Sequence, residues 1–230
     1  MLDKNEALEE RHNDKKTVGT TNSFFGENVA QMYNSTSWNR YPKLFKECTD
    51  RLPKNGIIMS FGCSIGYEGF SQFLYKGAEK ATVVGVDINP ENIADAKALQ
   101  EKYYPDIGDR ILFTTSLEVA MTGRRFDLIY ANSVLCRWKM TKDMENISHI
   151  YPFDEFEKML RILAESLKVG GFLVVYNGNY RLTDTSLSKY FEPLVHVVEK
   201  HFVHQYDPQG NRVADGEKNY PAIFKKIREL

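Results

Sequence analysis

A loop with two glycines, FGCSIGYE (61–68), joins a hydrophobic run to a predicted helix. Glycine lets the backbone come close to a bound nucleotide, and a helix N-terminus offers N–H groups that lack partners within the helix. Alone, such a loop is weak evidence, because short glycine loops also serve only to turn the chain. Gly62 and Gly66 therefore need a second signal before they predict a binding site.

Asp87 supplies that second signal. It follows the hydrophobic run VVGV (83–86), 21 residues after Gly66. Dinucleotide-binding folds carry an acid about 20 residues beyond the loop, where it accepts hydrogen bonds from ribose hydroxyls. An alternative role for Asp87 is to cap the following helix, but Asn89 is better placed for that role. Loop and acid together predict a ligand that contains ribose.

Two other enzyme classes compete for the same residues. A serine hydrolase would use Gly62 to Gly66 as a G-x-S-x-G elbow, with Ser64, Asp127 and His201 as a triad. That elbow normally follows several strands, and no convincing strand precedes residue 56. An NAD(P)-dependent oxidoreductase needs glycine at the sixth position of its fingerprint, where Tyr67 stands here. Both alternatives are disfavoured on these grounds, and a non-catalytic binding protein of the same fold stays open.

The elements that must position these residues alternate between strand and helix patterns from residue 56 onward. This alternation is typical of a parallel sheet with crossover helices. A polar turn and a final hydrophobic run then predict an antiparallel pair at the C-terminal end. The expected strands are 56–61, 81–88, 110–116, 126–135, 171–177, 198–207 and 221–227.

Two helices stand out between these strands. Residues 91–103 follow Asn89 as a cap and Pro90 in the first turn. Residues 154–168 carry apolar side chains at helical spacing, with Asp154 as the expected cap and Val169-Gly170-Gly171 as the stop. The fold class predicted is α/β: a doubly wound, seven-stranded, mostly parallel sheet with a C-terminal antiparallel hairpin and helices on both faces.

The domain organisation follows from the same patterns. Residues 1–22 are polar and charged, which predicts a flexible N-terminal arm. Residues 23–52 mix aromatic and polar residues and predict a helical cap segment that packs on a larger body. Residues 53–230 form the predicted ligand-binding domain.

The series GIIMSFGCSIGYE, VVGVDINPENIADAKA, FDLIYANSVL and LKVGGFLVV resembles, in this order, the motifs of class I S-adenosylmethionine-dependent methyltransferases. The likeness covers residues 56–178, and the C-terminal hairpin fits the last two strands of that family. It implies a methyltransferase that uses S-adenosylmethionine and releases S-adenosylhomocysteine. Ser64 replaces the middle glycine of the usual G-x-G-x-G, and Ser116 replaces an acid often found after the third strand.

The resemblance also implies site residues. The methionine part of the donor would lie against the loop, the ribose on Asp87 and the adenine on Ile88, with Ser116 and Leu117 at its edge. Asn132 would line the place where donor and acceptor meet. The expected donor-binding residues are thus Phe61, Gly62, Cys63, Gly66, Asp87, Ile88, Ser116, Leu117 and Asn132.

The connection 136–153, after the fourth strand, is far longer than the two to six residues that compact α/β units usually need. Excess loop at the carboxyl end of a sheet usually serves a site. We therefore expect the acceptor there, with His149 as the best candidate for an optional general base. The candidate acceptor residues are Trp38, Arg40, Arg137, Trp138, His149 and Tyr151.

Charge and composition restrict the kinds of substrate and ligand that we expect for this protein. The net charge of −1 argues against a nucleic-acid substrate. With the resemblance to methyltransferases, we expect a small-molecule acceptor with an O or N nucleophile. The three scattered cysteines, Cys48, Cys63 and Cys136, predict reduced thiols rather than disulfides or a zinc site. His201 and His204, three apart in a predicted strand, point to opposite faces, so no metal site is expected. Without a signal peptide or a membrane-spanning run, the protein is expected to be cytoplasmic.

Overall fold

The computed structural model describes residues 36–195, 203–214 and 221–230. The predicted arm 1–22 and residues 23–35 of the predicted cap segment 23–52 lie outside these residues. The described chain divides into two compact units, which meet in sequence at Thr122 and Gly123. No helix of the described residues is long and apolar enough to cross a membrane.

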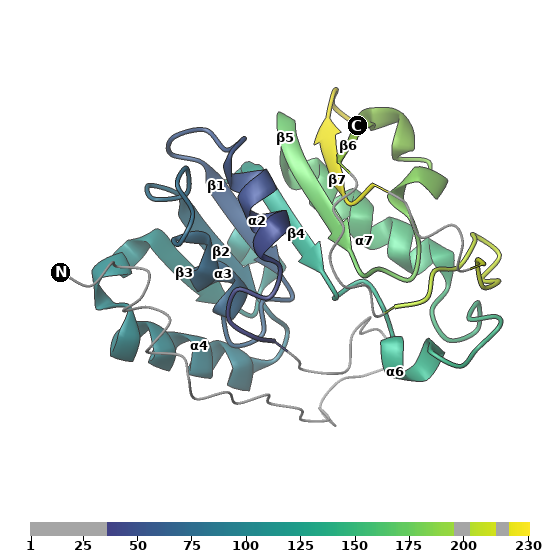
Figure 1. Cartoon of the computed structure of the whole chain (residues 1–230), viewed down its shortest axis with the longest axis horizontal. Coiled ribbons are helices and arrows are strands. Elements are labelled where there is room, and N and C mark those ends of the chain that lie inside the picture. Colours follow the sequence, from purple (N-terminus) through teal and green to yellow (C-terminus); the bar gives the residue numbers. More distant parts are fainter. Residues whose placement is uncertain (1–35, 196–202, 215–220) are drawn as a thin grey trace. The chain divides into compact units, whose positions relative to one another are not determined.

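The first unit contains three parallel strands in the order β3-β2-β1 (Figure 1). Helices and a 3-10 turn connect them, as the alternating pattern predicts. The elements are α2 (Pro42–Thr49), β1 (Ile57–Phe61), α3 (Tyr67–Gln72), β2 (Thr82–Val86), α4 (Pro90–Tyr103), η1 (Pro105–Arg110), β3 (Ile111–Thr114) and α5 (Leu117–Met121).

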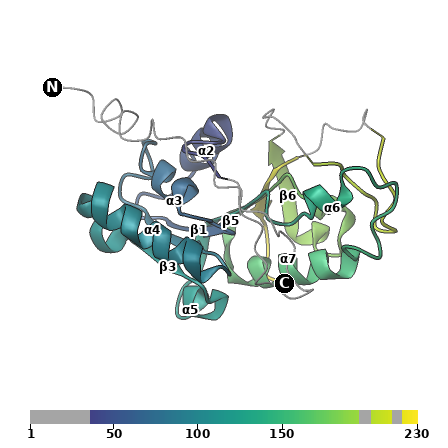
Figure 2. The same ribbon diagram turned by 90° about the horizontal axis from the view of Figure 1, so that it is seen from below.

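Helices cover both faces of these three strands. In Figure 2, α2 and α3 lie on one side of the strands and α5 lies on the other. The face under α3 presents Val83 and Ile111, which would touch a side chain added at Gly69. Since successive residues of a strand point to opposite faces, β2 buries side chains on both sides, as its run TVVGV suggests.

The second unit contains four strands in the order β4-β5-β7-β6. β4 and β5 are parallel, while β7 pairs antiparallel with both β5 and β6. The elements are β4 (Phe126–Asn132), α6 (Trp138–Thr141), α7 (Phe153–Ser166), β5 (Leu167–Tyr176), η2 (Leu182–Asp184), η3 (Ser188–Tyr190), β6 (Phe191–Val195) and β7 (Ile223–Lys226).

The predicted fold class is confirmed: a seven-stranded sheet, mostly parallel, ends in an antiparallel hairpin. One strand of that hairpin was misplaced. It is β6 and not 198–207, of which 198–202 lie outside the described residues and Tyr206 forms only an isolated bridge with Arg212. The run FEPLV (191–195) contains a proline, a residue that edge strands tolerate and that masked the strand signal.

The junction of α7 and β5 also differs from the prediction. The helix ends at Ser166, and Pro152 rather than Asp154 is its N-cap residue. Leu167 already pairs with Phe126, while the next pair joins Leu128 to Phe172, so residues 168–171 bulge from the ladder. Gly170, with φ 85°, serves this bulge and not a helix stop.

A fully buried lysine, Lys226, connects the last strand, β7, to the junction of α7 and β5 by hydrogen bonds. Lys226 Nζ donates to the backbone oxygens of Ala164 (2.9 Å) and Leu167 (2.8 Å) and to Glu229 Oε2 (2.8 Å). Cations near the end of a helix stabilise its last carbonyl groups. The same lysine hydrogen bond, followed by that from Arg125, lowers the pKa of the Glu229 carboxyl. The C-terminal strand is therefore held by charge as well as by the sheet.

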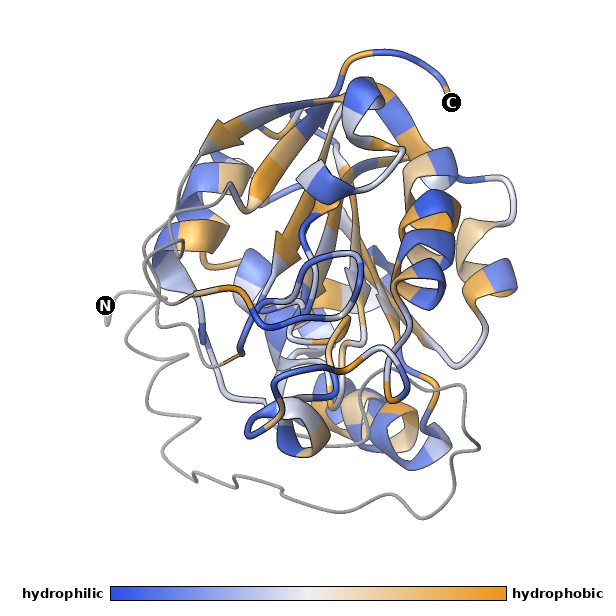
Figure 3. Cartoon of the chain, turned by 90° about the vertical axis from the view of Figure 1, so that its right-hand side faces the viewer, coloured by the Kyte–Doolittle hydropathy of each residue, from blue (hydrophilic) through white to orange (hydrophobic). Residues whose placement is uncertain are grey.

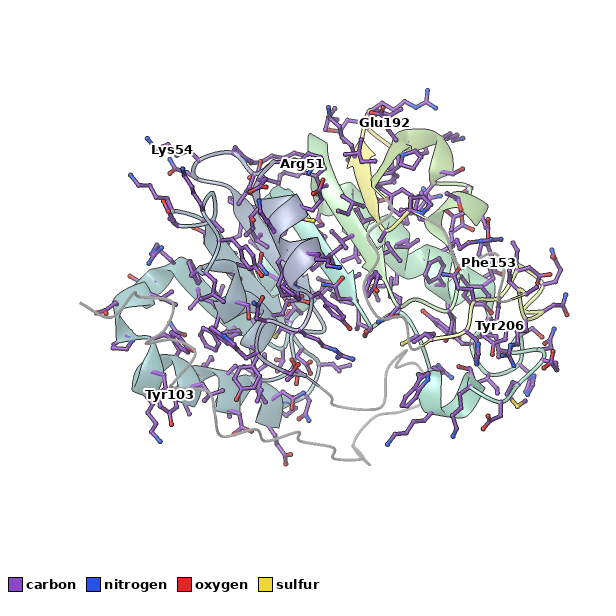
Figure 4. The ribbon with its side chains drawn as sticks, in the orientation of Figure 1. Arg51, Lys54, Tyr103, Phe153, Glu192 and Tyr206 are labelled. Atoms are coloured by element: carbon purple, nitrogen blue, oxygen red, sulfur yellow. The ribbon has the colours of Figure 1, made fainter. Side chains whose placement is uncertain are left out.

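Hydrophobic residues are concentrated on the strands, while the helices mix both kinds (Figure 3). In the second unit, however, a polar side chain organises the loops after β4 and β5. Asn179 is fully buried; its Oδ1 accepts from the Arg137 amide (2.8 Å) and its Nδ2 donates to the His204 oxygen (3.1 Å). Its backbone amide donates to the Leu135 oxygen, and its backbone oxygen accepts from the amide of Tyr206, which is labelled in Figure 4. Three segments distant in sequence meet at this one residue.

We predict that Asn179→Ala destabilises the chain by about 1–3 kcal/mol, because the partly buried Arg137 N–H and His204 C=O lose their partner. Urea denaturation followed by circular dichroism measures the change. Asn211→Ala is the matched control: this exposed asparagine also makes side-chain hydrogen bonds, to Asp207 and Asn146, but its groups can bond to water instead. Equal losses for the two variants would contradict a special role for Asn179.

Candidate functional site

The glycine loop leaves β1 with every second residue in the left-handed region. The φ angles are 74° at Gly62, 51° at Ser64 and 88° at Gly66. The amides of Gly62 and Cys63 both donate to the Val86 oxygen, at 2.8 and 3.0 Å. These two bonds attach the loop to the end of the neighbouring strand β2. The carboxyl ends of β1 and β2 therefore lie side by side at the loop.

Phe113 on β3 explains why two of the nearby positions are glycine. A Cβ atom on Gly66 would lie 2.7 Å from Phe113 Cζ, and one on Gly85 would lie 2.5 Å from Phe113 Cδ1. The aromatic ring occupies the space under the loop that side chains would otherwise fill. Gly66 is thus required twice, by its backbone angle and by its close contact.

Ser64 stands where the usual motif has its middle glycine, and the structure shows that the position keeps the left-handed conformation. This conformation costs a residue with a Cβ roughly 1–2 kcal/mol. A hydrogen bond offsets the cost: the Ser64 amide donates to Asp87 Oδ2 at 2.7 Å. The acid predicted from spacing is therefore joined directly to the loop.

Asp87 is also tied to the start of α4. Its Oδ1 accepts from the Asn89 amide and from Asn92 Nδ2, both at 3.0 Å. The Asn89 side chain caps the helix by accepting from the Glu91 amide (2.9 Å), which confirms Asn89 as the cap. The side-chain cap of α4 is therefore Asn89, and the ribose role of Asp87 stays a prediction.

Two exposed apolar side chains follow Asp87 in the sequence. Ile88, directly after Asp87, is 56% exposed, and Val119 on α5 is 53% exposed. Of the other predicted adenine contacts, Leu117 begins α5 and Ser116 caps it, with Oγ accepting from the Val119 amide (3.1 Å). The capping role accounts for a serine at that position.

Sequence reasoning missed Glu68. The Ser60 hydroxyl donates to Glu68 Oε1 at 2.6 Å, so a carboxylate at the start of α3 is held against the end of β1. An acid two residues after the second glycine was visible in the sequence, but its direction was not. Between these groups, burial, followed by the charges of Asp87 and Glu68, raises the pKa of the Cys63 thiol, which keeps that thiol protonated.

Trp38, from the predicted cap segment, lies on the first unit's own aromatic residues. Its ring stacks on Tyr104 with centroids 5.9 Å apart and meets the edge of Tyr67 at 6.3 Å. Tyr67 directly follows Gly66, so Trp38 packs beside the loop. Arg40 lies over the ring of Tyr41 at 5.1 Å. Both residues, predicted to contact an acceptor, thus also have packing partners.

In the second unit, Asn132 is the last residue of β4 and is 8% exposed. The residue after it, Ser133, and Asn177 after β5 are both left-handed, with φ 55° and 53°. Asn177 Nδ2 donates to Ser133 Oγ at 3.1 Å, which links the carboxyl ends of the two parallel strands. Strained, polar backbone of this kind is concentrated at functional sites.

The structure brings together two of the four acceptor candidates in the connection 136–153. The Arg137 guanidinium lies 5.4 Å from the Tyr151 ring centroid and also donates to the Ile150 oxygen. Trp138, by contrast, is 36% exposed on α6, and His149 is exposed. Arg137 and Tyr151 therefore form the inner side of this connection, while Trp138 and His149 face outward.

The Tyr151 hydroxyl is the most informative group of this connection. Tyr151 is 1% exposed, yet its hydroxyl has no hydrogen-bond partner among the described residues. Burial, and then the neighbouring Cys136, raises its pKa, so the group is a neutral donor. The ring packs on Tyr180 (5.8 Å), which in turn contacts Phe153 (5.2 Å). Phe153 is labelled in Figure 4. A buried hydroxyl without a partner costs about 1–3 kcal/mol, which a bound ligand can remove.

In the part of the chain that the structure describes, no group of three or more His, Cys, Asp or Glu side chains could hold a metal ion. The three cysteines are buried and form no disulfide. His204 contacts Arg212, at 3.1 Å from its Nδ1, while His201 lies outside the described residues.

Comparison with known proteins gives one family. A family model described as "Methyltransferase domain" matches residues 52–225. A search of curated proteins gave no match. Solved structures with a similar fold include YcgJ from Bacillus subtilis (14% identity, 58% of this chain and 47% of that one, TM-score 0.41).

Two further structures are similar. One is a putative rRNA methylase from Clostridium thermocellum (17% identity, 85% of this chain and 99% of that one, TM-score 0.46). The other is the S-adenosylhomocysteine-bound methyltransferase PaMTH1 from Podospora anserina (22%, 59% and 50%, TM-score 0.40). The chain spans about half or less of PaMTH1 and YcgJ.

We predict opposite effects for two substitutions in the loop. Gly66→Ala should lower the free energy of unfolding by about 2–4 kcal/mol, since it adds left-handed strain and a contact with Phe113. Ser64→Gly should raise it by about 0.5–1 kcal/mol, because glycine relieves the strain at that position. Chemical denaturation of the purified variants measures both.

Gly123→Ala is the control for the loop pair. Gly123 also has a positive φ (67°), but an added Cβ there would meet nothing within 4 Å. It should cost only the strain, about 1 kcal/mol. A loss at Gly66 no larger than that at Gly123 would show that Phe113 does not support the loop.

Proposed function

We propose a reaction for this chain, which belongs to the methyltransferase domain family: transfer of a methyl group from S-adenosylmethionine to an O or N nucleophile of a small-molecule acceptor. Family membership confirms the resemblance to class I methyltransferases. It also confirms the expected donor, S-adenosylmethionine, and product, S-adenosylhomocysteine. The acceptor and the residue roles below are our proposals.

The observation that carries the donor site is the loop bonded to the acid. A backbone with left-handed residues at 62, 64 and 66 is packed on Phe113 and bonded to Val86 and Asp87, which holds it in place at the carboxyl ends of β1 and β2. We assign the methionine part of the donor to Phe61, Gly62, Cys63 and Gly66. The ribose is assigned to Asp87, and the adenine to Ile88, with Val119 as an added apolar contact.

Glu68 completes the donor site in our proposal. The donor's α-ammonium is a cation, and β1 itself (IIMSF) carries no acid. The Glu68 carboxylate, fixed by Ser60 at 2.6 Å, provides a negative charge beside the loop. Charge-assisted hydrogen bonds of this kind are shorter and stronger than neutral ones. Ser116 and Leu117 keep their predicted place near the adenine edge, and Asn132 keeps its predicted place in the second unit.

The mechanism requires little chemistry from the side chains. The donor, when bound, supplies an electrophilic methyl group. The chain's residues bind and orient it: Asp87 and the loop hold one end, while apolar side chains exclude water. Correct alignment alone can provide a large part of the rate enhancement. A general base is optional, and His149 stays a prediction from the sequence, because its side chain is exposed on the outer side of the connection 136–153.

For the acceptor we propose the inner side of the connection 136–153. The buried Tyr151 hydroxyl requires a partner that the described residues do not supply, and a polar group of the acceptor fits that need. Arg137 and Trp138 belong to the same connection. An acceptor contact by Trp38 and Arg40 stays a prediction from the sequence. The balanced net charge supports a small molecule rather than a nucleic acid. A cytoplasmic location also stays a prediction.

A serine hydrolase finds little support. Ser64 is 7% exposed, and the described residues of its unit, 36–122, contain no histidine. Its left-handed backbone matches an elbow, but the bond to Asp87 joins the backbone amide and not the hydroxyl. An oxidoreductase is opposed by Tyr67, which makes an edge-to-face contact with Trp38 at the position where a dinucleotide site needs glycine.

For the donor we predict that S-adenosylmethionine and S-adenosylhomocysteine raise the melting temperature, while NAD and NADP do not. Asp87→Ala should weaken S-adenosylhomocysteine binding by about 1.5–3 kcal/mol, the range for a lost hydrogen bond to a charged group. Calorimetry measures the affinity. Asp95→Ala, an exposed acid on α4, should leave it unchanged. Stabilisation by NAD alone, or wild-type affinity in Asp87→Ala, would refute the assignment.

For the acceptor we predict that Tyr151→Phe lowers kcat/KM about tenfold, with donor affinity and stability at or above wild type. The reason is that only the hydroxyl is lost, and no described protein group depends on it. Turnover is followed by homocysteine release with an acceptor found by screening metabolite classes. Tyr180→Phe is the control: its hydroxyl donates to the Tyr151 oxygen, so stability should fall. Unchanged kcat/KM in Tyr151→Phe would exclude the hydroxyl from the acceptor site.

A further inference from the structure

Asn92 lies in the first turn of α4 and has no role in the site as described so far. Its side chain is almost fully buried, with 5% of the residue exposed. Its Nδ2 donates to Asp87 Oδ1 at 3.0 Å, five residues back along the chain. The buried Asn92 side-chain amide is therefore hydrogen-bonded to the acid that we assign to the ribose.

The position of Asn92 in the helix makes this bond informative. With Asn89 as the cap, Asn92 is the third helical residue, where a glutamate or glutamine commonly reaches back to the N–H of the cap residue. Here Asp87 accepts that N–H instead, at 3.0 Å. A glutamate at 92 would repel Asp87, whereas the amide of asparagine donates to it. Asparagine is otherwise a weaker helix former than glutamate, so the bond to Asp87 accounts for its presence.

The bonds also determine which part of the carboxylate faces a ligand. A carboxylate has about four acceptor positions, two on each oxygen. Asn89 and Asn92 occupy Oδ1, and the Ser64 amide occupies one position on Oδ2. With Oδ1 held from the side of α4, the carboxylate does not rotate, and Oδ2 keeps an acceptor position beside the loop.

We propose that Asn92 is a positioning residue for the methyl donor: its amide holds the Asp87 carboxylate in the orientation that accepts a ribose hydroxyl. This inference rests on the proposed ribose role of Asp87. It adds a residue that does not touch the donor but determines how well the chain distinguishes a ribose from a sugar without hydroxyls.

The test compares two ligands by calorimetry on the full chain: S-adenosylhomocysteine and its 2′,3′-dideoxy analogue. Wild type should bind the first at least tenfold more tightly. Asn92→Leu, which keeps the approximate size but removes the donor, should reduce that ratio about tenfold by weakening only S-adenosylhomocysteine. A merely structural asparagine would weaken both ligands equally and leave the ratio unchanged.

Asn92→Asp tests the same point with an isosteric side chain, should the leucine variant not fold. It replaces the donor by a charge that repels Asp87, so the ratio should fall at least as far. Gln100→Leu is the matched control, because this amide on α4 donates to the Gly108 oxygen (2.9 Å) and should leave the ratio at the wild-type value.

The outcomes separate the two claims. Equal wild-type affinity for the two ligands would overturn the ribose role of Asp87 and the role of Asn92 with it. Discrimination by wild type that persists in the folded Asn92 variants would overturn the role of Asn92 alone. A reduced ratio in those variants, with Gln100→Leu unaffected, supports the positioning role.

Discussion

The hydrogen bond from the Ser64 amide to the Asp87 carboxylate, 2.7 Å long, joins the two parts on which the first unit's site depends. The loop after β1 holds three left-handed residues, and one of them is not glycine. Such a backbone persists only where its surroundings determine it. The Phe113 ring packs against the loop, the Val86 oxygen accepts hydrogen bonds from two loop amides, and the Asp87 carboxylate accepts one from the Ser64 amide. The geometry proposed for the donor follows from these few contacts.

A second constraint is the burial of polar groups in loops. In the first unit, Asn92 and Asn89 both serve Asp87. In the second unit, Asn179 joins three distant segments from a fully buried position. Buried polar groups stabilise only when they are paired, so each of these residues restricts the loops around it to one arrangement. The buried hydroxyl of Tyr151, by contrast, has no partner among the described residues, and for that reason we place the acceptor beside it.

The errors of the sequence-based prediction have identifiable causes. Pro193 weakened the strand pattern of the edge strand β6, so the pattern predicted a strand at 198–207 instead. Gly170 and Gly171 suggested the end of a helix, whereas they form a bulge that the pairing of Phe126 with Leu167 requires. Glu68 was overlooked because its role depends on the direction of a side chain toward Ser60. Each error concerns a feature that local pattern does not encode.

The sequence by itself determined the alternation of strands and helices, the glycine loop, the acid 21 residues beyond it and, through these, the methyltransferase family. Hydrophobic periodicity and glycine placement are local properties, so they can be read without coordinates. Only the tertiary structure decided which groups Asp87 binds, that Ser64 keeps a glycine-like conformation, and that Arg137 and Tyr151 face inward while Trp138 and His149 face outward. These features depend on contacts between residues far apart in the chain, and such contacts exist only once the strands have paired.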